Sequence, residues 1–463
     1  MLAPRAKIAT MSDLGPEADG TAGAADHPTR SAAPARTPGT WGLRADLLRH
    51  GAGHSSDKVG YVELFFDLVF VFAVTQLSHS LIAHPDVETL LHTLILGAAV
   101  WYLWIDTTWV TNWLDPDRLP VRTMLIVLMA LGLVMSSAIP EAFDSKALLF
   151  AVPYVTIQVG RSVFAALALN RSWSENGAGF LRITAWVSVS GILWITGALV
   201  DDGLRLTLWG AAVLIDYAGP RAMFAVPFFG RTDPRTWTVR ADHMAERVSL
   251  FVIISLGESI IITGTAFAEL EVTAVTLLSF GAAFASTVLM WLLYFDRSER
   301  RATEFFARAD STTGMVAQTA YTYVPLLLVL GIVLTAVADE LVLLAPTGGA
   351  GGAEHAGGVA AGALDHAGTV AGSAATHGSD PWTAGLVCGA AAVYLLGNLL
   401  FRRSTGGRWS LPHLVGIVAV AALFAAHPWA APLTLNWVSN AVLLAVIVGD
   451  VVVSRREPAQ ERA

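Results

Sequence analysis

Charged residues and cysteine are both scarce in this chain. Asp, Glu, Lys and Arg make up 14% of its 463 residues, whereas soluble domains contain roughly 25%. Hydrophobic residues make up 54% of the chain, which indicates a membrane protein. The single cysteine, Cys388, lies in an apolar run, so we expect no intrachain disulfide and no cysteine-based metal site.

Other absences narrow the classes of function. The net charge of −8 provides no basic surface for nucleic acid. No G-x-x-x-x-G-K-[ST] loop is present, which argues against ATP-driven transport by this chain alone. H-E-x-x-H and G-x-S-x-G motifs are also missing, so no catalytic residue, metal or cofactor is predicted. Residues 1–40 lack the apolar run of a signal peptide, so we expect the first apolar span to direct insertion.

Long apolar runs separated by turn-forming residues fill most of the chain. A bilayer core of about 30 Å requires about 20 apolar residues in a helix. The runs therefore predict an all-α polytopic membrane protein with about twelve transmembrane helices. The predicted spans are residues 61–82, 90–111, 119–139, 147–169, 181–200, 204–225, 245–268, 272–295, 317–338, 383–402, 411–427 and 433–453.

Arginine is concentrated in alternate connections between these spans. Arg118 and Arg122 follow the second span, for example. The connections on the opposite side contain Lys146 and Arg205 as their only Lys or Arg residues. Because cytoplasmic loops are enriched in Lys and Arg, the alternation predicts that both termini are cytoplasmic. The predicted tails are residues 1–57, expected to be disordered, and residues 455–463.

The two halves of the chain share short motifs in the same order. Residues 101–106 read WYLWID and residues 291–296 read WLLYFD, while Glu246 opens the seventh span as Glu63 opens the first. Since six helices is an even number, the halves are predicted to be parallel six-helix repeats. The predicted organisation is a first repeat at 58–226 and a second at 227–454, the latter containing a low-complexity Gly/Ala/His outer loop at 345–381.

Acidic residues inside apolar spans are costly and therefore mark candidate functional sites. Glu63 and Asp67 lie one helical turn apart near the cytoplasmic end of the first span, where the helix dipole favours anions. Asp106 and Asp296 end two inward-running spans, so we expect them at a similar depth. Two interpretations stay open: a carboxylate cluster that handles an ion or substrate, and a salt-bridge network that holds the helices together.

Glu258 is predicted to lie near the middle of the bilayer. It follows Glu246 by about 18 Å of helix. A carboxyl group at that depth is either paired with a base or protonated, so it can carry protons or bind cations. In the first span, Gln76 and His79 lie toward the outer side, and histidine titrates at about pH 6.5 when unperturbed. The candidate ion- or substrate-binding residues are Glu63, Asp67, Gln76, His79, Asp106, Glu246, Glu258 and Asp296, with Arg161, Arg221 and Arg247 as candidate counter-ions.

Some further polar and aromatic residues are interpreted structurally. Asp216, Asn436 and Asn440 are expected to form hydrogen bonds between helices. Tryptophans such as Trp101 and Trp104 are expected to anchor helices at the membrane interface.

Two motifs resemble those of a known family. The stretch VELFFDLVFVFAVTQLSH at 62–79 and the stretch AERVSLFVIISLGESI at 245–260 look like the bacterial low temperature requirement protein A (LtrA) family. The resemblance covers roughly residues 58–455. It implies a polytopic membrane protein, but the family name refers to a cold-growth phenotype and implies no biochemical activity.

Paired acids, a midplane glutamate and two repeats favour an ion-coupled secondary transporter or permease of the cell membrane. Its expected partners are the lipid bilayer and an unidentified small solute or ion. An ion channel, an integral-membrane enzyme acting on lipid, and a non-transporting structural protein are the alternatives. The sequence identifies neither the solute nor the oligomeric state.

Overall fold

The fold is built from α-helices. The structure is a computed structural model that describes residues 47–49, 59–169, 175–233, 240–298, 313–348 and 378–456. All of these residues belong to the unit Gly42–Ala463. Within these ranges no strand is present, and β-pairing is limited to two isolated bridges, Leu48 with Leu114 and Val226 with Gly230.

Each predicted span contains a helix, whose bounds differ from the predicted ones by up to seven residues. Asp86 and Asp380 cap helices by accepting hydrogen bonds from backbone N–H groups in the first turn, as N-cap carboxylates do. The first half contains α1 (Tyr61–Ala83), α2 (Val87–Trp113), α3 (Leu119–Ser137), α4 (Ala147–Leu169), α5 (Glu175–Ala198) and α6 (Asp202–Arg221). The second half contains α7 (Ala241–Ala268), α8 (Ala274–Leu293), α10 (Thr313–Gln318), α11 (Val324–Leu344), α13 (Pro381–Ser404), α14 (Leu411–Leu423) and α15 (Pro432–Arg456).

Short irregular helices join or extend these elements. Two are 3₁₀ turns, η2 (Ile139–Glu141) and η9 (Phe424–Ala426). Two are π-helices, η5 (Tyr294–Ser298) after α8 and η6 (Thr319–Tyr323) between α10 and α11. Through η6, the segment Met315–Leu344 is one continuous helical span.

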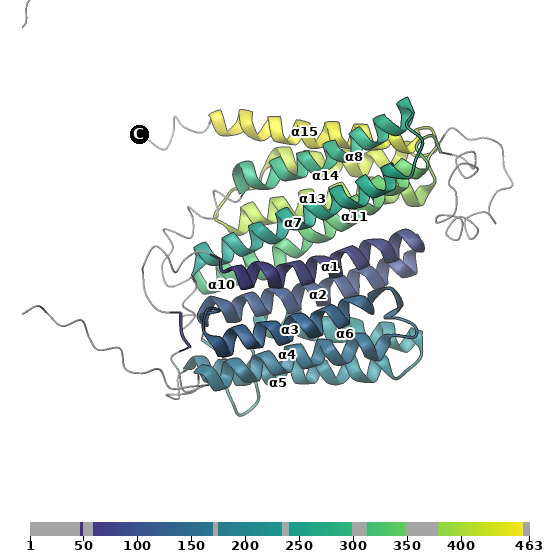
Figure 1. The fold of residues 1–463 in the computed structure, drawn as a ribbon. Helices are drawn as coiled ribbons and strands as arrows, with labels where there is room; N and C mark the ends of the chain where they lie inside the picture. The colour runs from purple at the N-terminus through teal and green to yellow at the C-terminus, as the bar shows by residue number, and fades with distance from the viewer. Residues whose placement is uncertain are drawn as a thin grey trace, which may run out of the picture. The chain divides into compact units, whose positions relative to one another are not determined.

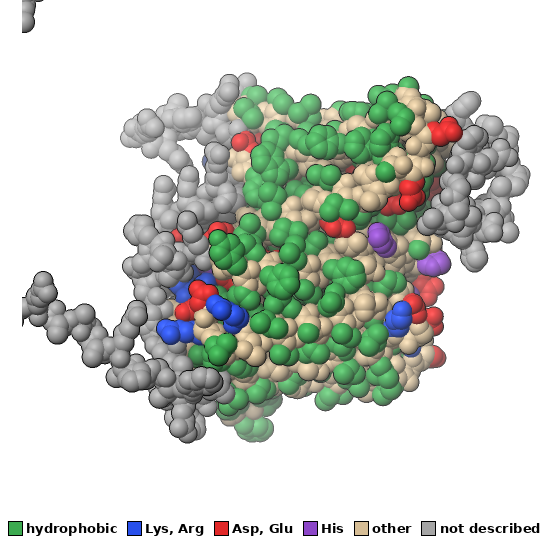
Figure 2. All heavy atoms as spheres, in the orientation of Figure 1, with side chains coloured by type: hydrophobic (Ala, Val, Ile, Leu, Met, Phe, Trp, Pro, Cys, Tyr) green, Lys and Arg blue, Asp and Glu red, His purple; other side chains and the backbone are tan. Residues whose placement is uncertain are grey.

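Ten of the described helices are long and apolar enough to cross a membrane. The two other predicted spans are also helical, but α6 does not meet the same criteria, and α14 with η9 is a shorter apolar helix, Leu411–Ala426. In Figure 2, hydrophobic side chains cover much of the visible face, and the visible Lys and Arg side chains gather near its two ends. This distribution suits helices whose middle portions face lipid.

The helices pack in the same order within each half (Figure 1). In the first half, α1 contacts both α2 and α3. From α3 to α6, each helix contacts the next one in the chain, and α6 also contacts α2. In the second half, α7 contacts both α8 and α11. Then α11 contacts α13, α13 contacts α14, α14 contacts α15, and α15 also contacts α8. The halves meet where α1 and α2 contact α7 and α11.

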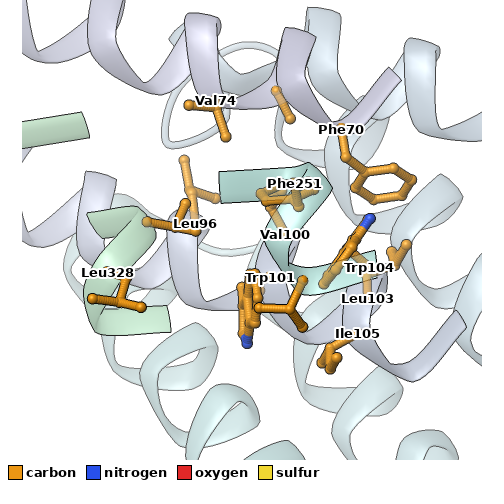
Figure 3. Close-up of a cluster of buried hydrophobic side chains, with 14 of the residues drawn as sticks. Phe70, Val74, Leu96, Val100, Trp101, Leu103, Trp104, Ile105, Phe251 and Leu328 are labelled. Carbon is orange, nitrogen blue, oxygen red and sulfur yellow. The ribbon is translucent and has the colours of Figure 1, made fainter. Parts of the chain in front are cut away.

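The core between the halves is rich in large aromatic side chains (Figure 3). Phe70 from α1, Trp101 and Trp104 from α2, Phe251 from α7 and Leu328 from α11 are buried together. The prediction that Trp101 and Trp104 are interfacial anchors is therefore wrong. Their indole N–H groups donate to buried acceptors of other helices, which removes the need for an aqueous interface.

Two of the predicted segments fall mostly outside the described residues. Of the predicted N-terminal tail, residues 47–49 are described. Arg49 N donates to the Trp113 carbonyl oxygen, and Asp115 N donates to the Leu47 carbonyl oxygen. Of the predicted outer loop 345–381, residues 349–377 are not described.

α11 and α13 approach each other closely because glycines lie at their contact. A Cβ atom placed on Gly331 would lie 3.0 Å from both the Cα and the N of Tyr394. On the other helix, a Cβ on Gly397 would lie 3.1 Å from the Leu328 nitrogen. Small residues permit this backbone approach between membrane helices.

Gly331→Ala should therefore destabilise the protein by about 1–3 kcal/mol, because the added methyl group overpacks a rigid backbone contact. The measurement is the thermal unfolding midpoint in detergent. Gly389→Ala on α13 is the matched control, since no atom lies within 4 Å of its added Cβ. Equal midpoints for the two variants would contradict the close packing.

Candidate functional site

A buried cluster of charges joins the two halves of the molecule. Arg247 on α7 donates from Nη1 to Glu63 Oε1 at 3.0 Å and from Nη2 to Asp67 Oδ1 at 2.5 Å. Both carboxylates are fully buried, and Arg247 is 1% exposed. Because Glu63 and Asp67 lie one turn apart on α1, a single guanidinium fork contacts both.

Other groups also bond to the two carboxylates, although Asp67 Oδ2 has no hydrogen-bond partner among the described residues. Glu63 Oε2 accepts from the Gly60 backbone N–H at 2.9 Å and from Arg49 at 3.2 Å, and Glu63 Oε1 contacts His243 Nε2 at 3.0 Å. Trp104 Nε1 donates to Asp67 Oδ1 at 2.7 Å. The bond from the Gly60 N–H group places Glu63 at the N-terminus of α1, where free N–H groups and the helix dipole stabilise an anion.

Asp106 meets a different guanidinium. Arg161 on α4 donates to Asp106 Oδ2 at 2.6 Å, to Thr107 Oγ1 at 2.9 Å and to the Leu103 carbonyl oxygen at 3.0 Å. It also donates to Gln158 Oε1. Arg161 is 1% exposed, whereas the Asp106 side chain is 16% exposed. The carboxylate therefore lies on the accessible side of the pair, with the guanidinium behind it.

A cavity of about 50 Å³ lies beside Asp106. It occupies the end of the bundle where α2 ends, α5 begins and α6 ends. Four of its eleven lining residues are aromatic, and Gln318 and Thr322 are contributed by α10 and η6. Its principal side chains are Asp106, Trp109, Trp113, Phe180, Phe224 and Thr322.

The predicted residues of the second half do not join these clusters among the described contacts. Glu246 is exposed, accepts a hydrogen bond from Val59 N at 3.3 Å and lines an open cavity of about 260 Å³. Asp296 is exposed within η5. Glu258 is half-buried on α7 and has no hydrogen bond or ion pair with any residue that the structure describes.

The remaining predicted residues also lie apart from Glu63 and Asp67. Gln76 is half-buried and His79 is exposed on α1. The Arg221 guanidinium lies 4.6 Å from the centre of the Tyr323 ring, a cation–π contact rather than a contact with an acid. Of the three predicted counter-ions, Arg161 and Arg247 therefore pair with predicted acids.

Three buried carboxylates are not among the predicted site residues, and one of them, Asp450 on α15, pairs with Arg402. Asp216 on α6 accepts from Tyr154 Oη at 3.0 Å. Asp339 on α11 accepts from Asn436 Nδ2 at 2.7 Å. Asp339 escaped notice because the predicted span ended at residue 338, whereas α11 continues to Leu344. The signal that could have revealed it is the pair Asn436 and Asn440, which was interpreted only as helix packing.

These features define a class of protein: an all-helical, multi-pass integral membrane protein with buried charges between its helices. The family model of the bacterial low temperature requirement A protein (LtrA) matches residues 58–448, and the chain belongs to this family. An uncharacterised protein of Rhizobium meliloti (strain 1021) is 36% identical over 398 residues, which cover 85% of this chain and 89% of that protein. No solved structure gives a significant match.

Arg247→Met should lower the free energy of unfolding by about 3–5 kcal/mol, because it leaves two buried carboxylates without their guanidinium. Thermal unfolding in detergent is the measurement. Adding Glu63→Gln and Asp67→Asn to the variant should recover part of the loss, because the buried charges are then removed.

The matched control is Arg122→Gln, which breaks the exposed ion pair with Asp117. Exposed pairs contribute about 0–1 kcal/mol, so its midpoint should change little. If Arg247→Met unfolds at the same temperature as this control, the Arg247 pairing does not hold the halves together.

Proposed function

We propose that this integral membrane protein is an ion-coupled secondary transporter or permease. The proposal is supported chiefly by Asp106, a charged side chain that reaches a cavity from within a membrane helix. Most buried carboxylates of a purely structural bundle would be enclosed by their partners, as Glu63 and Asp67 are. Asp106 instead faces a cavity, while its partner Arg161 is held behind it by neutral acceptors.

The proposed topology has twelve spans in two parallel six-helix repeats, with both termini in the cytoplasm of the cell. Its support is the matching order of helix contacts in the two halves together with the alternation of arginine along the sequence. In this orientation the Asp106 cavity opens toward the cytoplasmic side, since α2 ends there. Asp106 precedes the last residue of α2, Trp113, by about 10 Å of helix.

The chemistry of this cavity favours a small solute with a positive charge and apolar surface. Arg161 bonds only the Oδ2 atom of Asp106, and Oδ1 has no hydrogen bond with any described residue. Trp109, Trp113 and Phe180 line the cavity, and aromatic rings attract cations. A quaternary ammonium group bound between these rings can contact Asp106 without displacing Arg161, which keeps its bonds to Gln158, Thr107 and Leu103.

Glu258 remains the proposed protonation or cation site of α7. Its carboxyl group makes no hydrogen bond or ion pair with any described residue, which leaves its oxygens available to a cation. A non-transporting structural role is the second candidate function. It is favoured by the Glu63–Asp67–Arg247 cluster, whose burial explains these three residues without any transport.

Asp106→Asn should reduce the uptake of radiolabelled tetramethylammonium into proteoliposomes by at least about tenfold, because the amide cannot balance the charge of a cation in the cavity. The uptake is measured under imposed gradients of pH and of Na⁺. Asp117→Asn, at an exposed acid in the loop after α2, is the control and should transport normally. Equal uptake by the two variants would remove Asp106 from the solute site, and uptake equal to that of empty liposomes would exclude this solute class.

Glu258→Gln should abolish the dependence of that uptake on the ion gradient, because the amide neither binds nor releases a proton. The test compares uptake with and without the gradient in the same vesicles. Glu269→Gln is the control at the end of the same helix, at an exposed carboxylate. Gradient dependence that survives in Glu258→Gln would exclude Glu258 from the coupling step.

A further inference from the structure

Oxygen-bearing side chains from three helices converge in the second half of the molecule. Ser286 lies on α8, Thr335 and Asp339 on α11, and Asn436 and Asn440 on α15. All five are buried, and together they line a cavity of about 10 Å³. We refer to these five residues as the Asp339 cluster. Its cavity has about the volume that one water-sized particle requires.

Oxygen acceptors surround the Ser286 hydroxyl group at the centre of the cluster. The Ser286 hydroxyl oxygen has four acceptor oxygens within 3.5 Å, those of the Ala282 carbonyl, Asp339 Oδ1, Asn436 Oδ1 and Asn440 Oδ1. A hydroxyl group carries a single hydrogen, so most of these oxygens receive nothing from Ser286. The Asn440 amide donates to the Ala282 carbonyl at 2.9 Å and to Asn436 Oδ1 at 3.2 Å, and the Asn436 amide donates to Asp339 Oδ1 at 2.7 Å. Asn440 Oδ1 is then left as the acceptor for the Ser286 hydroxyl at 3.0 Å.

Two oxygens of the cluster have no hydrogen-bond partner among the described residues. Asp339 Oδ2 and Thr335 Oγ1 are buried without a hydrogen bond to any described residue. Asp339 is 2% exposed and Thr335 is 7% exposed, so bulk water does not satisfy them. Buried polar atoms without partners are costly, which points to a bound species that contacts both of them.

No basic side chain balances the charge of Asp339. Among the described residues, no Lys, Arg or His forms an ion pair with Asp339, whereas Glu63, Asp67, Asp106 and Asp450 each have an arginine. The polar neighbours of Asp339 are neutral amides and hydroxyls. Carboxylate, amide and hydroxyl oxygens are ligands of hard cations, and a single carboxylate matches a single positive charge.

We propose that the Asp339 cluster is a binding site for a monovalent cation, Na⁺. Asp339 supplies the charge, and Thr335, Ser286, Asn436 and Asn440 supply neutral oxygens. The small cavity favours Na⁺ over larger monovalent ions, and the single carboxylate disfavours Ca²⁺, whose sites use several acidic groups.

The continuous helix of α11 connects this site to the Asp106 cavity. Thr322 in η6 lines the cavity, and Asp339 lies about 25 Å further along the same helical span. The widened turn of η6 leaves the Thr322 carbonyl oxygen free to accept from Trp101 Nε1 at 2.7 Å, and Thr322 Oγ1 accepts from Trp109 at 3.0 Å. A shift of α11 on cation binding would therefore reach the cavity wall. This coupling role rests on the proposed function, whereas the cation site itself does not.

The test is thermal unfolding of the purified full chain in detergent, in NaCl, KCl and choline chloride at equal ionic strength. Saturating Na⁺ should raise the midpoint by about 5 °C over choline, since a ligand that binds only the folded state stabilises it. Asp339→Asn should abolish this rise. Glu340→Gln, at the adjacent half-buried carboxylate, should keep it.

Thr335→Val separates binding from folding. Because Thr335 Oγ1 makes no hydrogen bond to the protein, its removal should leave the midpoint in choline unchanged or slightly higher. The Na⁺ concentration that gives half of the maximal rise in the midpoint should increase about tenfold, because the variant lacks one of the oxygens that would bind the ion. Equal midpoints of the wild type in Na⁺ and choline would overturn the site. If the unfolding midpoint of the wild type depends on pH but not on Na⁺, and Asp339→Asn removes the dependence on pH, the site binds a proton instead.

The outcomes for the site and for transport are distinguishable. A rise with Na⁺ in detergent without any flux in liposomes would support the cation site and refute the transporter. Flux in liposomes without a Na⁺-dependent midpoint would support the transporter and refute the cation site.

Discussion

The contact of Arg247 with Glu63 and Asp67 is the interaction on which the arrangement of the two halves depends. An unpaired charge inside a membrane bundle is strongly unfavourable, so two carboxylates on α1 require a cation nearby. The structure supplies it from α7, with one guanidinium that contacts both acids. The aromatic core of Trp104 and Phe251 packs around this contact and excludes water from it. The halves are thereby joined through groups that cannot separate without leaving a buried charge.

The same constraint distinguishes three kinds of buried carboxylate in this protein. Glu63 and Asp67 are enclosed by an arginine and are best explained as structural. Asp106 has an arginine behind it and a cavity in front of it, so it can meet a solute. Asp339 has no basic partner and lies among neutral oxygens, which is the environment that a bound cation satisfies. The partner of each carboxylate, rather than its depth alone, separates structure from function.

The helical membrane fold could be predicted from the sequence because apolar runs and turn residues are local signals. The pairing of Arg247 with Glu63 could be anticipated only in outline, since it joins residues 184 positions apart. The burial of Trp101 and Trp104 could not be foreseen, because tryptophan serves equally in cores and at interfaces. Asp339 was missed for a different reason: a span boundary set by hydropathy alone lay at residue 338, six residues before the end of α11. Side chains that meet across helices have no signature in sequence spacing.

The proposed carrier has a cation site and a solute cavity at opposite ends of one helix. The measurement that tests it most directly is counterflow of radiolabelled Na⁺ in proteoliposomes at zero membrane potential. The account predicts that vesicles preloaded with unlabelled Na⁺ exchange the label faster than unloaded vesicles take it up, because a carrier reorients more readily when occupied. Label entry that is independent of internal Na⁺ would indicate a channel, and entry no faster than in empty liposomes would contradict transport altogether.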